Sequence, residues 1–196
     1  MLSAWGRGSA ESRTAGSPGA RDERTLVRRA QGGSQEAIES LYRAHWARSR
    51  RAAYLIVHDA AASEDIAQEA FLAAVRALDR FDRRRPFGPW LHRIVVNRAI
   101  DWARRRALRA EVGVDPENAG SETAAVAPSP SEIGDEVVSA LAALPAEQRA
   151  LIVLRYLLEY TPGEIAAMLE LPRGTVNSRL RRGLDRLGEL LGEALR

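Results

Sequence analysis

The sequence predicts an all-α protein in which two small helical domains are joined by a flexible acidic linker. Apolar residues recur at helical spacing over most of residues 22–109 and again from about residue 135 to the end. Residues 110–134 interrupt this pattern with prolines, glycines and small residues, and they hold five acidic residues and no basic one. The 196 residues are sufficient for two small hydrophobic cores.

Composition excludes several classes of protein. No apolar run approaches the length of a membrane span, and the N-terminus lacks the apolar segment of a signal peptide. The absence of cysteine excludes disulfides and thiolate metal sites. All 29 basic residues are arginine, so every basic site offers a planar, bidentate donor. We therefore expect a cytoplasmic protein, in which a formal net charge of only +3 conceals a strong segregation of charge.

The first elements can be predicted from caps and periodicity. Residues 1–21 are small and polar without periodicity, so we expect a disordered tail. A short helix over 22–30 ends at Gly32 and Gly33, and Ser34 is a suitable N-cap for a long helix that continues to about residue 57. His58, Asp59 and the alanines that follow are expected to form a loop.

The next predicted helix, 63–81, has two different faces. One is an apolar stripe of Ala67, Ala70, Phe71, Ala74, Val75 and Leu78, and the other carries Asp65, Gln68, Glu69, Leu72 and Arg76. An exposed leucine framed by carboxylates and an amide favours a partner contact, and the alternative is a solvated face with one isolated leucine. A metal site at Asp65 and Glu69 is disfavoured, because that face has no histidine and no third carboxylate.

A basic and aromatic region follows. Residues 81–89, with two prolines and a glycine, predict a loop that carries Arg83, Arg84 and Arg85, and 90–109 predicts a helix. Arginines interleaved with Trp90 and Trp102 are typical of single-stranded nucleic acid binding. The alternative is that the tryptophans are buried and the arginines only solvate the surface; we expect Trp102 in the core and leave Trp90 open.

The second domain predicts a helix-turn-helix near its end, after a helix from about residue 133 and another that begins near Pro145. Thr161 is a suitable N-cap, Pro162 suits the first helical position, and Glu164 completes a capping box. Residues 171–172 end this helix, because the residue before a proline disfavours the helical conformation.

The final helix separates an apolar spine from a polar outer face. The spine consists of Val176, Leu180, Leu184, Leu187 and Leu191. Ser178 and Arg182 lie opposite, flanked by Asn177, Arg179 and Arg181. This arrangement favours duplex recognition over the alternative of an ordinary amphipathic surface helix.

Three motifs resemble those of the extracytoplasmic-function, or group IV, RNA polymerase sigma factors of the sigma-70 family. SEDIAQEAFLAAV (63–75) is similar to the family's polymerase-binding motif, PWLHRIVVNRAIDWARR (89–105) to its WLxRIxxNxxxDxxR signature, and LPAEQRALIVLRYL (144–157), with the helix-turn-helix, to its promoter-recognising C-terminal domain. The resemblance implies a sigma region 2 domain at 22–109 and a region 4 domain at 135–196. It also implies a transcription initiation factor that needs no cofactor, metal or catalytic residue.

The resemblance further implies partners and site residues. Core RNA polymerase would bind through its β′ clamp helices and β flap, with Asp65, Gln68, Glu69, Phe71 and Leu72 as polymerase-binding residues. The −10 promoter element would be recognised and melted by Arg83, Arg84, Arg85, Trp90, Arg93 and Asn97. The −35 element would be contacted by Arg149, Arg173, Thr175, Asn177, Ser178, Arg179, Arg181 and Arg182. An anti-sigma factor is a further expected partner.

The sequence departs from the family pattern at two positions, and two other classes of protein have to be weighed against this interpretation. Glu170 occupies a turn position that is often glycine, and Asn177 stands where a basic residue is common. A free-standing repressor would usually be a symmetric dimer, and the sequence shows no heptad seam. A nucleic-acid-processing enzyme would have to use Asp65 and Glu69, but no nucleophile–base pair or phosphate loop accompanies them. The acidic linker either threads through the polymerase's basic channels, as the resemblance implies, or is a solvated tether.

Overall fold

The computed structural model describes residues 19–111 and 134–194, and every regular element within these ranges is helical. The first part consists of α1 (Ala20–Gln31), α2 (Gln35–Val57), α3 (Ala60–Ala77), the 3-10 turn η2 (Leu78–Arg80) and α4 (Phe87–Glu111). The second consists of α5 (Asp135–Ala142), α6 (Ala146–Ile152), the π-helical turn η4 (Val153–Leu157), α7 (Pro162–Leu169) and α8 (Arg173–Ala194). The all-helical prediction is confirmed.

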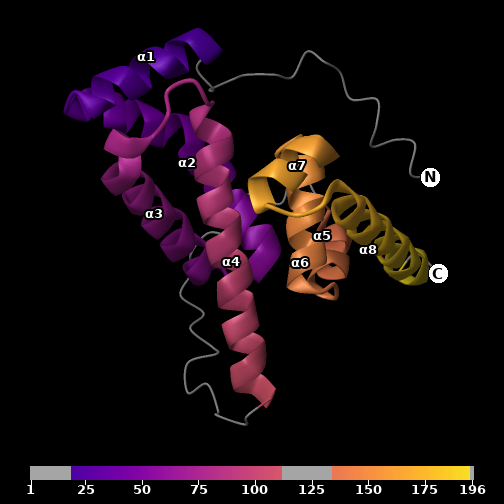
Figure 1. Ribbon diagram of the computed structural model, residues 1–196. Helices are drawn as coiled ribbons and strands as arrows, with labels where there is room; N and C mark the ends of the chain where they lie inside the picture. Colours follow the sequence, from indigo (N-terminus) through magenta and orange to yellow (C-terminus); the bar gives the residue numbers. More distant parts are fainter. Residues whose placement is uncertain (1–18, 112–133, 195–196) are drawn as a thin grey trace.

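The two parts lie side by side, with α5 to α7 against α2 and α4 (Figure 1). The C-terminal half of α4 projects beyond α3 (Figure 1). The predicted tail falls almost wholly outside the described residues, as does most of the predicted acidic linker. Ala110 and Glu111, which we placed in that linker, are the last residues of α4.

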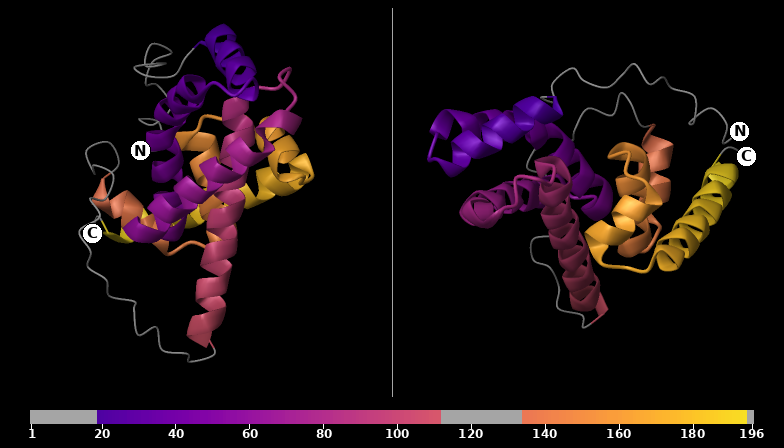
Figure 2. Two further views of the ribbon diagram at one scale, coloured as in Figure 1. Left: turned by 90° about the vertical axis from the view of Figure 1, so that its left-hand side faces the viewer. Right: turned by 45° about the horizontal axis from the view of Figure 1, so that its top comes forward.

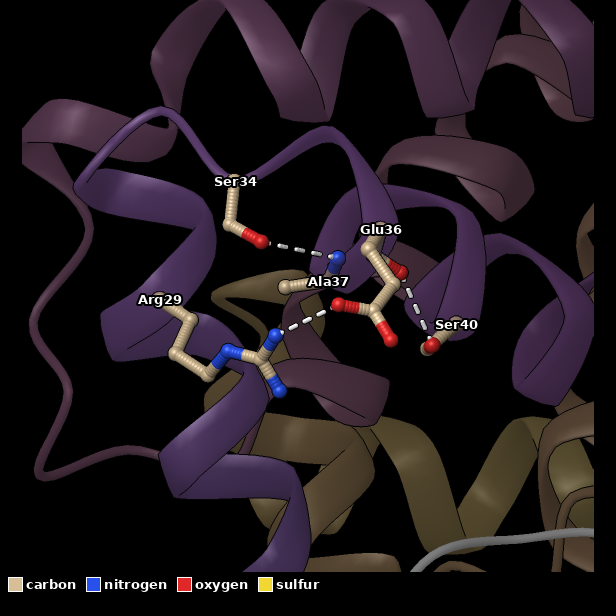
Figure 3. A network of polar contacts seen from close by, with 5 residues as sticks. All are labelled: Arg29, Ser34, Glu36, Ala37 and Ser40. Atoms are coloured by element: carbon tan, nitrogen blue, oxygen red, sulfur yellow. Dashed lines mark hydrogen bonds and ion pairs between the residues drawn. The ribbon is translucent and has the colours of Figure 1, made fainter.

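The turn between α1 and α2 follows its sequence signals. Gly33 has a φ of 86°, a conformation that glycine adopts at little cost. Ser34 Oγ then accepts the N–H of Ala37 at 3.3 Å, which confirms it as the N-cap of α2. Arg29 donates to the Glu36 carboxylate at 2.7 Å and ties the end of α1 to the start of α2 (Figure 3).

The loop predicted after α2 is much shorter in the structure. His58, with a φ of 53°, ends α2, and the side chain of Asp59 accepts the N–H of Ala62 at 2.9 Å. Helix α3 therefore begins at Ala60, three residues earlier than predicted. The alanines that we placed in a loop are strong helix formers once a cap precedes them.

Helix α4 also begins earlier than predicted, at Phe87. The Phe87 N–H donates to Glu23 Oε2 at 3.1 Å, and Pro89 is tolerated because a first-turn N–H has no acceptor within the helix. Glu23 also lies 3.0 Å from His45 Nε2. Burial alone would raise the pKa of Glu23, but these hydrogen bonds and the His45 charge lower it. At Gly88 a Cβ atom would lie 3.1 Å from the His45 ring, so the close approach of α4 to α2 favours glycine there.

The buried apolar residues form one cluster that runs through both parts. In the first part α2, α3 and α4 enclose Leu41, Ile56, Phe87, Leu91 and Val95. In the second part Leu151, Leu154, Ile165 and Val176 are buried. The predicted spine of α8 is buried at Val176, Leu180 and Leu187, and half-buried at Leu184 and Leu191.

Candidate nucleic-acid interfaces

The outer face of α3 has the predicted composition. Asp65, Gln68, Glu69 and Leu72 are all exposed, and 47% of Leu72 is accessible, which makes it one of the few exposed large apolar side chains. Glu69 accepts a hydrogen bond from Arg98 of α4 at 2.6 Å. These four side chains share one surface.

Phe71 does not belong to that surface. It is 7% exposed and meets Tyr42 of α2 edge-on, with ring centroids 5.0 Å apart. The motif that implied direct contact places Phe71 on the inward stripe, where an aromatic ring is buried. We therefore assign it a supporting role beneath the exposed residues.

A cavity of about 350 Å³ opens between the end of α3 and the start of α4. It is lined by Ala77, Arg80, Phe81, Asp82, Arg85 and Trp90. Trp90 is half-buried: one part packs on Phe81, with centroids 4.5 Å apart, and on Phe87, at 5.6 Å. Because Trp90 also lines the cavity, it is both a packing residue and an accessible aromatic surface. Arg80 and Phe81 also line this cavity, although the site prediction missed them; they continue the basic and aromatic run that was visible in the sequence.

The loop beside this cavity presents three exposed arginines, Arg83, Arg84 and Arg85. Asp82 shapes it, because its side chain accepts the N–H of Arg84 at 2.9 Å and its carbonyl accepts that of Arg85 at 3.0 Å. Of the other predicted −10 residues, Asn97 is exposed on α4, whereas Arg93 is half-buried and donates to Glu170 of the second part at 2.5 Å.

A second cavity, of about 330 Å³, lies between α3 and α4, with Asp65, Glu69, Arg98 and Trp102 among its lining residues. Trp102, which we expected in the core, is half-buried and has the Arg106 guanidinium 5.1 Å from its ring centre. No group of three or more potential metal ligands occurs among residues 19–111 and 134–194.

The predicted capping box of α7 is present. Thr161 Oγ1 accepts the Glu164 N–H at 3.3 Å, and Glu164 Oε2 accepts the Thr161 N–H at 2.7 Å. Glu170 ends α7 with a φ of 55°, so a glutamate adopts the left-handed conformation that glycine favours at such a turn. Helix α8 follows after two further residues.

The outer face of α8 carries most of the predicted −35 residues. Arg173, Asn177, Ser178, Arg181 and Arg182 are exposed, and Thr175 and Arg179 are half-buried. Arg182 donates to the Ser178 carbonyl of its own helix at 3.3 Å. This face is polar and basic over the first part of the helix, as helix-turn-helix recognition requires, and it becomes acidic at Asp185 and Glu189.

Arg149 is placed differently from the prediction. It lies on α6, is half-buried and donates to the Ala142 carbonyl at 3.3 Å. Burial lowers the pKa of Arg149, although the nearby Glu147 carboxylate raises it. The guanidinium is therefore bonded within the second part, and its contact with the −35 element stays a prediction.

Comparison with known proteins agrees with this division of the chain. Residues 41–109 match Sigma-70 region 2, and residues 134–187 match Sigma-70, region 4. The ECF RNA polymerase sigma factor SigW of Bacillus subtilis is 30% identical over 178 residues, which cover 84% of this chain and 94% of SigW. The chain belongs to the extracytoplasmic-function sigma factors of the sigma-70 family.

Further relatives support the same family. SigM of Mycobacterium tuberculosis is 35% identical over 161 residues, covering 82% of this sigma factor and 80% of SigM. The solved structure of CnrH in complex with the cytosolic domain of CnrY matches with a TM-score of 0.66 and 31% identity, over 87% of this chain and 97% of that one. CnrH is a sigma factor of Cupriavidus metallidurans.

Family membership establishes the general activity. The protein is a sigma factor that directs RNA polymerase to promoters through regions 2 and 4, and sigma factors are initiation factors and not enzymes. Within the part of the chain that the structure describes, no helix is long and apolar enough to cross a membrane.

Proposed function

We propose that this sigma factor divides promoter recognition between its two domains, taken as residues 22–109 and 135–196. Region 2 captures and melts the −10 element, and region 4 binds the −35 element as duplex. The observation that supports this division best is the contrast between the two candidate surfaces. One is an aromatic cavity beside an arginine-rich loop, and the other is the convex, arginine-rich face of a helix.

The region 2 surface has the chemistry needed for unpaired bases. Removing a base from the stack costs a few kcal/mol, which stacking on an aromatic ring and enclosure in a pocket can offset. Trp90 supplies the ring and Arg85 a cation at the cavity wall, while Arg83 and Arg84 are exposed beside it. Asn97 extends this surface along α4, where its amide can donate to and accept from a base edge.

The region 4 surface has the geometry needed for a major groove. A recognition helix contacts base edges with a few outward side chains and phosphates with its flanks. On α8 we assign base contacts to Ser178 and Arg182, assisted by Asn177. Arg179 and Arg181 are assigned to phosphates, and Arg173 and Thr175 lie at the helix N-terminus, which favours anions.

The polymerase surface is assigned to Asp65, Gln68, Glu69 and Leu72 of α3, docking on the β′ clamp helices, with region 4 binding the β flap. An anti-sigma factor is a further proposed partner, supported by the relative CnrH, whose structure was solved with the cytosolic domain of CnrY. Both assignments imply action in the cytoplasm, where polymerase and DNA are found.

Transcription from a pool of templates tests the proposal. Core RNA polymerase is incubated with templates that carry a randomised upstream region, with and without the sigma factor, and the transcribed templates are sequenced. We expect sigma-dependent transcripts from templates enriched in two short elements at a fixed spacing. Enrichment of a single palindrome, or of no sequence, would contradict the proposal.

A further inference from the structure

The loop that joins α3 to α4 is held at both ends by side chains of α1. Residues 81–86 form no regular element and connect η2 to the start of α4. The last carbonyls of a helix and the first N–H groups of the next have no partner within their own helix. At both ends of this loop the partner comes from α1, which lies next to the start of α4 (Figure 2, left).

Gln31, the last residue of α1, holds the first end of the loop. Its Nε2 donates to the carbonyl oxygen of Leu78 at 2.8 Å and to that of Phe81 at 3.0 Å. An amide nitrogen carries two N–H groups, one for each of these carbonyls. Gln31 is half-buried, so water has limited access to replace it. The amide therefore fixes the backbone where the chain leaves η2.

Glu23, near the start of α1, holds the second end. Its Oε2 accepts the N–H of Phe87, the first residue of α4, and its Oε1 lies 3.0 Å from Nε2 of His45 on α2. A carboxylate at this place is also favoured by the positive end of the helix dipole. Only 13% of the Glu23 side chain is exposed. Glu23 thus acts as an N-terminal cap of α4 that is supplied by another helix.

The cavity of the proposed −10 surface lies between these two anchors. Phe81, whose carbonyl is held by Gln31, lines the cavity on one side, and Trp90, in the first turn of α4, lines it on the other. The two rings pack together with centroids 4.5 Å apart, and Phe87 contacts both, at 6.0 Å and 5.6 Å. A shift of either anchor would therefore move an aromatic ring that lines the cavity.

We propose that Glu23 and Gln31 are positioning residues for capture of the −10 element: from α1 they fix the two ends of the loop and so set the shape of the aromatic cavity. This inference rests on the proposed function, in which the cavity takes an unpaired −10 base. Neither residue lines the cavity, so both act through Phe81 and Trp90. The Sigma-70 region 2 match covers residues 41–109 and leaves α1 without an assigned role.

The environment of the Trp90 ring tests the inference without DNA. The full chain is labelled with fluorinated tryptophan, and the fluorine NMR resonance of Trp90 is assigned with Trp90→Phe. Gln31→Met keeps the length of the side chain and removes both donors. We expect the Trp90 resonance to shift or broaden, while those of Trp46 and Trp102 stay in place. An unchanged Trp90 resonance, or an equal change at all three tryptophans, would overturn the positioning role of Gln31.

The matched control is Thr25→Val on the same helix. It also removes a side chain–backbone hydrogen bond, that of Thr25 Oγ1 to the Arg21 carbonyl at 3.1 Å, but this bond lies within α1 and does not reach the loop. The Trp90 resonance of Thr25→Val should match the wild type. A change as large as that of Gln31→Met would show that any loss from α1 disturbs the cavity, against a specific role of Gln31.

A pair of variants at Glu23 separates capping from charge. Glu23→Gln keeps an acceptor oxygen for the Phe87 N–H, and its amide can donate to a neutral His45 ring. Glu23→Met has no acceptor. We expect Glu23→Gln to keep the Trp90 resonance near its wild-type position and Glu23→Met to displace it. If both variants displace it equally, or neither does, Glu23 does not position the cavity as a cap.

The consequence for DNA needs a second measurement, with holoenzyme and a fluorescent single-stranded −10 oligonucleotide from a promoter selected in the template pool. Gln31→Met should weaken its binding by roughly 2- to 10-fold, the equivalent of one net hydrogen bond, and leave binding of the −35 duplex unchanged. Wild-type affinity for the oligonucleotide would overturn the inference.

A double-mutant cycle shows whether Gln31 acts through the cavity. Gln31→Met should add little to the defect of Trp90→Ala, because both changes affect the same cavity. Full additivity would overturn the route through Trp90. If the template pool yields no promoter, the proposed function fails, while the fluorine resonance of Trp90 still decides whether α1 fixes the cavity.

Discussion

Helices α4 and α8 are both long and both rich in arginine, but their arginines are in different states. Four arginines of α4 are paired with carboxylates of other elements: Arg93 with Glu170, Arg98 with Glu69, Arg104 with Glu147 and Arg106 with Asp59. Within the described residues, Arg181 and Arg182 on the outer face of α8 form no ion pair. Positive charge alone therefore does not define a DNA-binding surface. Arg181 and Arg182 of α8 can contact DNA without breaking an ion pair. The four paired arginines of α4 must first release their carboxylate partners before they can bind DNA or polymerase.

The largest expected effect concerns polymerase binding, which we assign to α3 and not to α4 or α8. Asp65→Arg/Glu69→Arg reverses two exposed charges on α3 and brings an arginine next to Arg98. Because like charges across an interface cost several kcal/mol, we expect core binding to fall by roughly 100-fold or more in a co-purification or native-gel assay. Arg182→Ala on α8 should bind core normally. Wild-type binding by the double variant, with an unchanged melting temperature, would remove α3 from the polymerase interface.

The next prediction distinguishes the two DNA surfaces by the state of the template. Trp90→Ala should reduce transcription from duplex promoters by about 5- to 150-fold, because stacking is worth about 1–3 kcal/mol per base. It should matter much less on a template that is already unpaired across −10. Arg182→Ala should impair both templates equally, because the −35 element stays double-stranded in each. An equal defect of Trp90→Ala on both templates would indicate a packing role beside Phe81 and Phe87.

A smaller effect distinguishes two arginines of α8 itself. Arg182→Ala should cost about 1–3 kcal/mol and relax preference at one base pair, since a bidentate base contact is lost. Arg181→Ala should weaken all −35 sequences alike and lower the slope of log affinity against log salt by about one. Binding of a set of single-substituted −35 duplexes at several salt concentrations measures both. Uniform weakening by Arg182→Ala would reverse the two assignments.

Local signals carried most of the fold prediction. The apolar spine of α8, the Ser34 cap and the capping box of Thr161 and Glu164 are determined by residues a few positions apart, and the structure contains all of them. The early start of α3 depends on a local signal that the prediction missed, the Asp59 cap, whereas the early start of α4 has a non-local cause. Helix α4 begins at Phe87 because its first N–H is held by Glu23, which is 64 residues away in sequence. No spacing rule could have indicated that contact.

The sequence predicted which types of side chain form the candidate site, but it predicted less well which of them are exposed to solvent. Motif positions identified Phe71 and Arg149 as contact residues, but side-chain burial depends on packing between helices, which the sequence does not state. The same limit applies to Glu159 and Glu170. The sequence marks Glu170 only as a glutamate at a turn position that is often glycine, and it does not mark Glu159 at all. Only the three-dimensional contact reveals the arginine partner of each in the other domain.

The smallest expected effect concerns pH and the contact between the two parts. The protein is called closed when this contact is made, as in the structure, and open when it is not. Burial, followed by the charges of His45 and Arg48, lowers the pKa of His92 from 6.5 to about 3. The groups around its ring are His45, itself paired with Glu23, and Arg48 on the side of α2, and Tyr160 on the side of the second domain. Burial and the second domain's Arg149 likewise lower the pKa of His58 to about 4. Both shifts mean that the closed form binds protons more weakly than a solvated histidine would.

The sign of the pH dependence follows from these shifts. A lowered pKa favours closure fully above about pH 6.5 and progressively less as the pH falls toward 3, by up to about tenfold per pH unit for each histidine that becomes solvated on opening. Between pH 7.5 and 5.5 we therefore expect the open population to rise by about tenfold through His92 alone. The distance between spin labels at Arg28→Cys on α1 and Glu193→Cys on α8, both exposed sites in a chain without cysteine, measures it. His92→Asn keeps a polar partner for Tyr160 and should remove that dependence. His58→Asn, which suits the left-handed conformation at that position, should remove the contribution of His58. An open population that is independent of pH in the wild type would show that His92 stays buried when the domains separate, which places it in the core of region 2 and outside the closing contact.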